Sequence, residues 1–186
     1  NGIHNLLALR GDKPQWMSEE QFSQRYYEHA SDLTRDVKKA YDFSVAGACY
    51  PEIHPEAADL QEDIAHLKEK VEQGVDFLIT QLFYDNDVFY RFLEEVRKAG
   101  IDVPVLPGLM PITSIKQVKN IVQMSGTKLT ADLTEALQKY KDSPADFKKA
   151  GLEYSKRQME GLLAHRVDGI HLYSMNKVEI AKAIYE

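Results

Sequence analysis

The sequence has a single cysteine, Cys49, in 186 residues, which excludes an internal disulfide and fits a reducing, cytoplasmic compartment. No apolar run approaches the roughly 20 residues that a membrane-spanning helix needs. The first residues lack the charged start and apolar core of a signal peptide. The net charge of −6, with no cluster of lysine or arginine, argues against a surface for nucleic acid or anionic membranes. We therefore expect a soluble protein that binds neither.

Several sequence motifs with known chemistry are also missing. The six histidines show no paired spacing of the zinc-binding type, so we predict no metal site. Neither a Gly-x-Gly-x-x-Gly motif nor a P-loop occurs, which leaves a Rossmann-type nucleotide site without support. No serine or cysteine stands at a nucleophile elbow.

The chain does contain a regular alternation of short apolar runs and amphipathic segments. The apolar runs predict strands at residues 6–9, 43–48, 77–83, 103–106 and 169–173, of which the first reads as buried on both faces. The amphipathic segments predict helices at residues 18–27, 32–41, 58–73, 87–99, 114–124, 130–140, 144–166 and 177–185. Right-handed crossovers make such an alternation a parallel sheet covered by helices. We predict a single α/β domain over residues 1–186.

The loop at residues 47–57 is the most informative segment. Pro51 and Pro55 disfavour both helix and strand there, because proline fixes φ and lacks a backbone donor. The loop follows a predicted strand and displays an aromatic ring, an imidazole and two carboxylates (Tyr50, His54, Glu52 and Glu56). Ligands bind at this end of parallel strands, so we interpret the loop as part of a site. The alternative is a stiff connection with solvated side chains.

Other polar residues follow the remaining strands and would meet at the same rim: Arg10, Asp12, Gln81, Gln117, Asn176 and Lys177. Gln81 interrupts an apolar strand, and a buried amide costs a few kcal/mol unless it is paired. Its alternative role is a hydrogen bond to neighbouring backbone. For Asp12 the alternatives are a turn cap after Gly11 or an ion pair with Arg10.

Five segments taken together resemble the methylenetetrahydrofolate reductases: residues 7–12 (Leu-Ala-Leu-Arg-Gly-Asp), 50–57 (Tyr-Pro-Glu-Ile-His-Pro-Glu-Ala), 79–85 (Ile-Thr-Gln-Leu-Phe-Tyr-Asp), 107–112 (Pro-Gly-Leu-Met-Pro-Ile) and 173–177 (Tyr-Ser-Met-Asn-Lys). They occur in the family's order over nearly the whole chain. The resemblance implies a (β/α)8 TIM barrel that binds FAD at the carboxyl ends of its strands. This chain would cover about strands 4 to 8, with the first three strands absent from the recorded sequence.

The resemblance implies the activity and the site residues as well. The family reduces 5,10-methylenetetrahydrofolate to 5-methyltetrahydrofolate with FAD as cofactor and NADH or NADPH as hydride donor, in one-carbon and methionine metabolism. The positions that match FAD contacts are Arg10, Gly11, Asp12, Ala30, Tyr50, His54, Asp63, His66, Glu69 and Lys70. The positions that match folate contacts are Asp12, Gln81, Gln117 and Lys177. Asp12 would also tune the flavin electrostatically.

Three departures from the family pattern matter. The family's general acid is a glutamate on the first strand, and it has no counterpart in this chain. The loop between Asp12 and Ala30 is longer than in compact bacterial members and carries Trp16. Lys177 stands where relatives often have arginine, so a planar fork has become a point charge.

We therefore expect a flavin-dependent oxidoreductase that forms a homo-oligomer, and we expect this chain alone not to be active. One alternative is another flavin or folate barrel enzyme. The other is a non-catalytic half-barrel that acts as a binding or assembly module.

Overall fold

The computed structural model describes residues 2–11, 13–14 and 16–186. Within this part the chain forms a parallel sheet of five strands in the order β1-β2-β3-β4-β5. The strands are β1 (Asn5–Ala8), β2 (Ser44–Cys49), β3 (Phe77–Leu82), β4 (Val105–Leu109) and β5 (His171–Leu172). The helices are α1 (Glu19–Ser23), α2 (Ala30–Ala40), α3 (Leu60–Glu72), α4 (Asn86–Lys98), α5 (Ile115–Ser125), α6 (Ala131–Lys139), α7 (Pro144–Ala164) and α8 (Val178–Tyr185). The predicted α/β class and the extra helices in two connections are confirmed.

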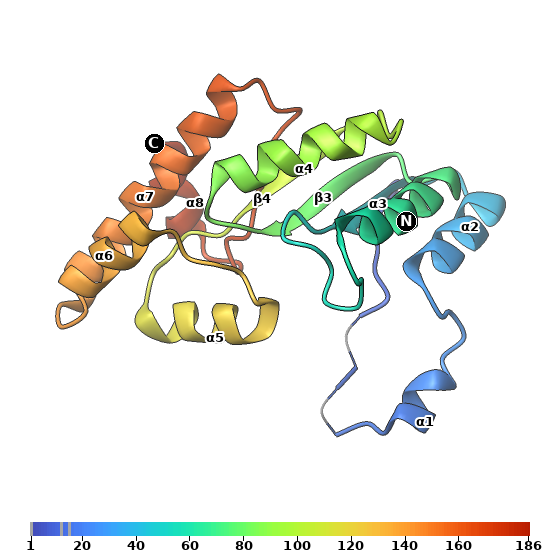
Figure 1. Cartoon of the computed structure of the whole chain (residues 1–186), viewed down its shortest axis with the longest axis horizontal. Coiled ribbons are helices and arrows are strands. Elements are labelled where there is room, and N and C mark those ends of the chain that lie inside the picture. The colour runs from blue at the N-terminus through green and yellow to red at the C-terminus, as the bar shows by residue number, and fades with distance from the viewer. Residues whose placement is uncertain (1, 12, 15) are drawn as a thin grey trace.

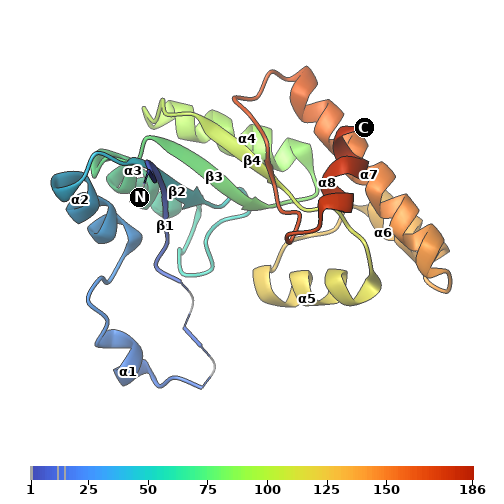
Figure 2. The same ribbon diagram turned by 180° about the vertical axis from the view of Figure 1, so that it is seen from behind.

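The sheet curls into a half-barrel, and α3 and α4 cover one of its faces (Figure 1 and Figure 2). Figure 1 shows α3 and α4 packed over the strands, while Figure 2, from behind, shows β1 to β3 with no described helix in front of them. Every neighbouring pair of strands is parallel and follows the chain order. These features are consistent with part of a TIM barrel.

The main core lies between the sheet and its covering helices. Leu78 of β3 is fully buried, as are Phe89 and Val96 of α4. The rings of Phe83 and Phe89 stack with centroids 5.4 Å apart. A second cluster joins the ends of β3 and β4 to the helical connection before β5, and it contains Tyr84, Ile112, Ile121, Leu133, Leu137, Phe147 and Tyr154. The second cluster holds the carboxyl ends of β3 and β4 in place.

The prediction that the first strand is buried on both faces is wrong. Leu7 of β1 is 41% exposed and Leu9 just beyond it is 52% exposed. The reason is topological, because β1 lies at the edge of the described sheet and pairs there with β2 alone. Apolar side chains on an edge strand indicate a surface that further structure would cover.

The helix predicted at residues 18–27 is shorter than its periodicity indicated. Its start is as expected, since the Ser18 hydroxyl accepts from Gln21 N in a capping box. Its end comes at Ser23, where the Arg25 guanidinium donates to the carbonyls of Phe22 and Glu28 and turns the chain. After Ser23, hydrogen bonds from the Arg25 side chain to backbone carbonyls take the place of the backbone hydrogen bonds that would continue the helix.

The fourth strand begins and ends later than predicted, at Val105–Leu109 in place of 103–106. Pro107 and Gly108 lie inside it, although proline lacks a ladder donor and glycine weakens strands. The β3–β4 register shifts at this point, and Gly108 N donates to the buried Thr80 hydroxyl at 2.8 Å. The Thr80 hydroxyl therefore accepts the hydrogen bond from Gly108 N in place of a backbone carbonyl of β3. The fifth strand is shorter than predicted, with only His171 and Leu172.

Candidate functional site

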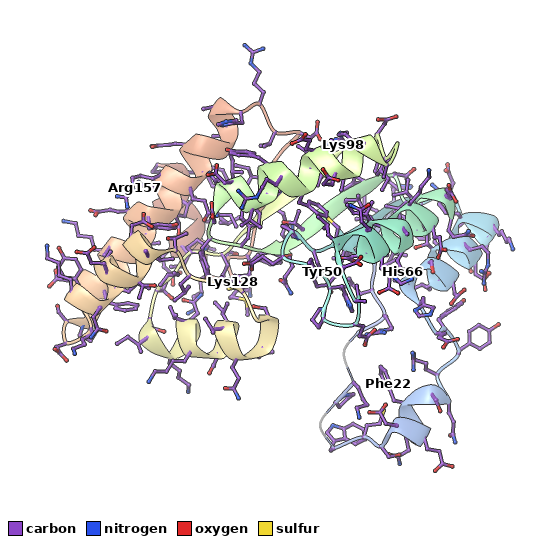
Figure 3. The ribbon with its side chains drawn as sticks, in the orientation of Figure 1. Phe22, Tyr50, His66, Lys98, Lys128 and Arg157 are labelled. Carbon is purple, nitrogen blue, oxygen red and sulfur yellow. The ribbon has the colours of Figure 1, made fainter. Side chains whose placement is uncertain are left out.

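The carboxyl ends of the parallel strands form one rim, where the candidate site residues lie. The loop after β2, the segment that carries α1, and α5 all extend to this side of the sheet (Figure 1). The structure brings residues from distant parts of the chain together there, including Arg10 after β1 and Glu56 after β2. Tyr50 and His66 mark the β2 loop and α3 at the same place (Figure 3).

Arg10 is held by a bidentate ion pair. Its Nη1 and Nη2 atoms each donate to a Glu56 carboxylate oxygen at 2.7 Å. This fork arrangement is the strongest that a guanidinium makes with a carboxylate, and it holds the pKa of Glu56 below its usual value. The Arg10 guanidinium carbon also lies 6.0 Å from the centroid of the Phe22 ring in α1. Glu56 was not predicted to hold Arg10, because 46 residues separate them.

The loop after β2 is organised around His54. The rings of Tyr50 and His54 meet edge to face with centroids 4.5 Å apart. His54 N donates to Asp63 Oδ2 of α3 at 2.9 Å, and Glu56 N donates to His54 Nδ1 at 3.1 Å. Because Nδ1 accepts, the neutral ring carries its proton on Nε2. Burial raises the pKa of Asp63, and the His54 N–H opposes that shift.

Lys70 of α3 reaches the end of β2. Its Nζ donates to Ala48 O at 2.7 Å. Gly47 leaves room for the lysine stem, since a Cβ there would lie 3.1 Å from Lys70 Cδ. Burial lowers the pKa of Lys70, the Asp63 carboxylate opposes this shift, and the nearby Arg10 cation adds to it. The two cations therefore share one electrostatic environment.

These residues fit a phosphate-bearing dinucleotide such as FAD. Two cations, an aromatic pair and strand-end backbone are the groups that such a cofactor needs. Gly11 has a φ of +78°, the left-handed conformation that glycine adopts without strain. Ala30 is the first residue of α2, and its carbonyl accepts from Thr34 Oγ1. Asp12 lies outside the described residues.

The remaining predicted cofactor positions are less well placed. His66 and Glu69 lie on α3 with Asp63 and Lys70, but both are exposed. Their expected FAD contacts stay predictions.

The two glutamines expected to contact folate differ in how the fold uses them. The strand position of Gln81 predicted a buried side chain, but the side chain is half-buried. Its Oε1 accepts from Leu82 N at 3.0 Å. Among the described residues its Nε2 has no hydrogen-bond partner. Gln117 braces its own loop, because its Oε1 accepts from Thr113 N and Oγ1 and its Nε2 donates to Pro111 O. Lys177 is exposed at the N-cap of α8.

Sequence reasoning missed a tyrosine that crosses the sheet. The Tyr173 hydroxyl donates to Thr80 O at 2.9 Å, its ring meets His171 edge to face, and burial raises its pKa to about 12. A Cβ on Gly108 would lie 2.7 Å from Tyr173 Cε2. The motif 173–177 contained this tyrosine, but only the curl of the sheet brings it against β3.

Glu52, one of the two carboxylates that the 47–57 loop was expected to display, connects two loops in the structure. Its carboxylate oxygens accept from Lys128 N at 3.2 and 3.3 Å, across 76 residues of sequence. The adjacent Thr127 hydroxyl donates to Leu82 O at the end of β3. Burial raises the pKa of Glu52. The loop after β2 and the connection after α5 are thus tied together (Figure 3 labels Lys128).

Within the described ranges, no three His, Cys, Asp or Glu residues are grouped as a metal site would require. The same ranges contain no helix that is long and apolar enough to cross a membrane. Cys49 is buried, and burial raises the pKa of its thiol.

Comparisons with known proteins give a consistent result. The family model for methylenetetrahydrofolate reductase matches residues 1–186. The chain is 36% identical to methylenetetrahydrofolate reductase (NADH) 1 of Arabidopsis thaliana over 95% of this chain and 32% of that protein. It is 34% identical to 5,10-methylenetetrahydrofolate reductase of Escherichia coli over 99% of this chain and 60% of that enzyme. The chain therefore spans between about a third and three fifths of these relatives.

A solved structure shares the fold. It is an uncharacterized protein from Clostridium thermocellum that binds two copies of 5-methyl-5,6,7,8-tetrahydrofolic acid. The TM-score is 0.53 at 21% identity, over 83% of this chain and 56% of that one.

Proposed function

Because the chain belongs to the methylenetetrahydrofolate reductase family, we propose that it helps to reduce 5,10-methylenetetrahydrofolate to 5-methyltetrahydrofolate. Bound at this rim, FAD would supply hydride-transfer chemistry between NADH or NADPH and the folate. The observation that carries the proposal is the joint position of Arg10, Lys70 and the Tyr50–His54 pair at one rim.

On the cofactor side, each residue has a role that follows from its contacts. Arg10 and Lys70 provide positive charge for the two phosphates, and the bond from Lys70 to Ala48 O fixes the ammonium at the strand end. Tyr50 and His54 provide a rigid aromatic wall, since Asp63 and Glu56 hold the loop backbone and the imidazole. We assign to Asp12 an electrostatic role beside the flavin, on the sequence resemblance alone.

On the folate side, Gln81 is the better-placed amide. Its side chain is half-buried at the end of β3 and has an NH2 group to offer to a pterin. Gln117 and Lys177 are assigned to the same substrate by the resemblance. Gln117 would have to exchange a loop bond for a folate bond, while exposed Lys177 offers a mobile point charge to a folate carboxylate.

We propose further that β1 and β5 pair with other strands to close a (β/α)8 barrel. The exposed Leu7 and Leu9 at the edge of β1 support this, because closure would remove that apolar surface from water. In the family the general acid comes from the part of the barrel that this chain does not contain. The 186 residues alone are therefore expected to be inactive and prone to aggregate.

The test uses the complete natural protein. Purified protein is denatured, and the released chromophore is identified by its absorption and chromatography. Release of FAD, and oxidation of NADH or NADPH that depends on methylenetetrahydrofolate, would support the proposal. Colourless protein that also fails to bind added FAD would contradict it and would favour the non-catalytic half-barrel.

A further inference from the structure

Arg10 is a cation at the rim, yet Glu56 already occupies its guanidinium fork. Two parallel N–H···O bonds of 2.7 Å join them. The same planar fork is the geometry with which arginine binds a phosphate. A phosphate that uses this face of Arg10 must therefore displace the Glu56 carboxylate or share the guanidinium with it.

The two partners of this pair are held unequally. The Arg10 side chain is only 17% exposed and lies near the Phe22 ring, whereas the Glu56 side chain is 61% exposed. The carboxylate can move into water at little cost, because most of it is already solvated. The guanidinium would stay at the rim. This asymmetry makes Glu56 the partner that gives way.

Asp63, the other carboxylate near Arg10 and Lys70, differs from Glu56 because it holds the loop backbone. Asp63 accepts the His54 N–H at 2.9 Å and is more buried than Glu56. Its removal would disturb the loop backbone. Glu56 also contributes its backbone N–H to His54 Nδ1, but that bond does not need its side chain. The Glu56 carboxylate can thus be neutralised while the bond from Glu56 N to His54 Nδ1 remains, and a glutamine would keep one of the two acceptors of Arg10.

We propose that Glu56 is a built-in counter-ion that competes with the cofactor phosphates for Arg10 and lowers the preference of the site for phosphate-bearing over neutral flavins. This inference rests on the proposed function, since it takes a flavin dinucleotide as the ligand. It predicts that the carboxylate works against cofactor affinity, although it lies among cofactor-binding residues. A merely structural Glu56 would have the opposite effect.

The experiment replaces Glu56 by glutamine in the complete natural protein. Glu56→Gln keeps the shape and one acceptor for Arg10 but removes the charge. Dissociation constants for FAD, FMN and riboflavin are measured on the apoprotein by quenching of flavin fluorescence. We expect FAD to bind on the order of fivefold more tightly, because a unit charge a few ångströms away is worth about 1 kcal/mol in water. FMN should gain as well, and neutral riboflavin should not change. Added salt should reduce the gain for FAD.

The control is Glu72→Gln, which makes the same change in net charge at an exposed position near the end of α3. It should leave all three constants unchanged. Weaker FAD binding by Glu56→Gln would overturn the inference, since it would show that Glu56 positions Arg10. Equal tightening of riboflavin would overturn it too. If the unmodified protein binds FAD while either of these results is found, the proposed function stands. If that protein binds no FAD, the proposed function fails together with the inference.

Discussion

The two halves of the rim are built in different ways. On the side of β1 and β2, charged side chains dominate, as in the Arg10–Glu56 ion pair and the Lys70 ammonium, whose pKa the Asp63 carboxylate influences. On the side of β3 to β5, neutral groups bond to the backbone, as Thr80 does with Gly108 N and Tyr173 does with Thr80 O. One half depends on charge and the other on shape.

This difference has a physical consequence. Ion pairs at a partly exposed rim can change partners, because water and ligands solvate either member when the pair opens. Close backbone contacts cannot adjust in this way, since an added atom forces strands apart in a densely packed interior. We therefore expect the charged half to respond to substitution mainly through ligand affinity, and the neutral half mainly through stability.

The largest effect is expected from Gly108→Ala. The new Cβ would overlap Thr80 O and lie 2.7 Å from Tyr173 Cε2, so β3, β4 and β5 would have to separate. We expect a loss of about 3 kcal/mol or more in unfolding free energy, or failure to fold. Urea unfolding followed by circular dichroism measures this. Gly169→Ala is the control, because a Cβ there meets Leu106 only at 3.6 Å. A nearly normal midpoint for Gly108→Ala would contradict the shape-dependent account.

The next effect concerns substrate binding by the neutral half. Gln81→Ala should slow the folate half-reaction on the order of a hundredfold, because an unmade bond to a desolvated partner costs up to about 3 kcal/mol. Reduction of the flavin by the nicotinamide should change less. Stopped-flow absorbance separates the two half-reactions. Equal losses in both would argue against a folate-specific role.

Gln117→Ala provides a comparison for Gln81→Ala, because the two glutamines differ in how many loop hydrogen bonds they make. This substitution removes the acceptor of Thr113 N and the donor to Pro111 O, so it should lower stability as well as folate turnover. Gln81→Ala removes only the bond from Leu82 N, so it should lower the melting temperature less than Gln117→Ala does. If the two variants melted alike, the distinction between a brace and a binding amide would be wrong.

A smaller effect is expected in the charged half from Lys70→Met. Methionine keeps an apolar stem over Gly47 but removes the cation, so FAD affinity should fall about tenfold. Fluorescence titration of the apoprotein gives the constant. Lys68→Met changes the net charge equally at an exposed position of α3 and should bind FAD normally. Normal affinity in Lys70→Met would remove Lys70 from the cofactor site.

The smallest effect is a pH dependence of stability that the Arg10–Glu56 pair causes. Arg10 lowers the folded-state pKa of Glu56 below the ordinary value of 4.5, so the pair stabilises the fold above that pH. The contribution is lost as the pH falls from 4.5 through the lower folded pKa. We expect it to be within about 1 kcal/mol, since exposed pairs contribute little. Thermal melts of the unmodified protein and Glu56→Gln should differ at pH 6 and approach each other as the pH falls well below 4.5. A constant difference across this range would contradict the linkage.

Much of the fold followed from local patterns. The capped start at Ser18, the alternating segments and the glycines after α3 and α4 are read within a few residues, because hydrogen bonds and apolar periodicity act over one or two turns. Gly74 and Gly100 do have the positive φ that such helix ends need. The rim residues were also predictable, since all parallel strands end on one side.

Only the tertiary structure decided which residues meet. Arg10 pairs with Glu56 across 46 residues, Glu52 with Lys128 N across 76, and Tyr173 with Thr80 O across 93. The edge position of β1 exposes an apolar strand that its composition alone indicates to be buried. Composition and periodicity indicate whether a segment is expected to be buried or exposed. The curl of the sheet and the packing of its helices determine which residues it actually contacts. The sequence by itself determined most of the elements, their order and the polar groups at their ends, and the three-dimensional curl of the sheet determined their partners.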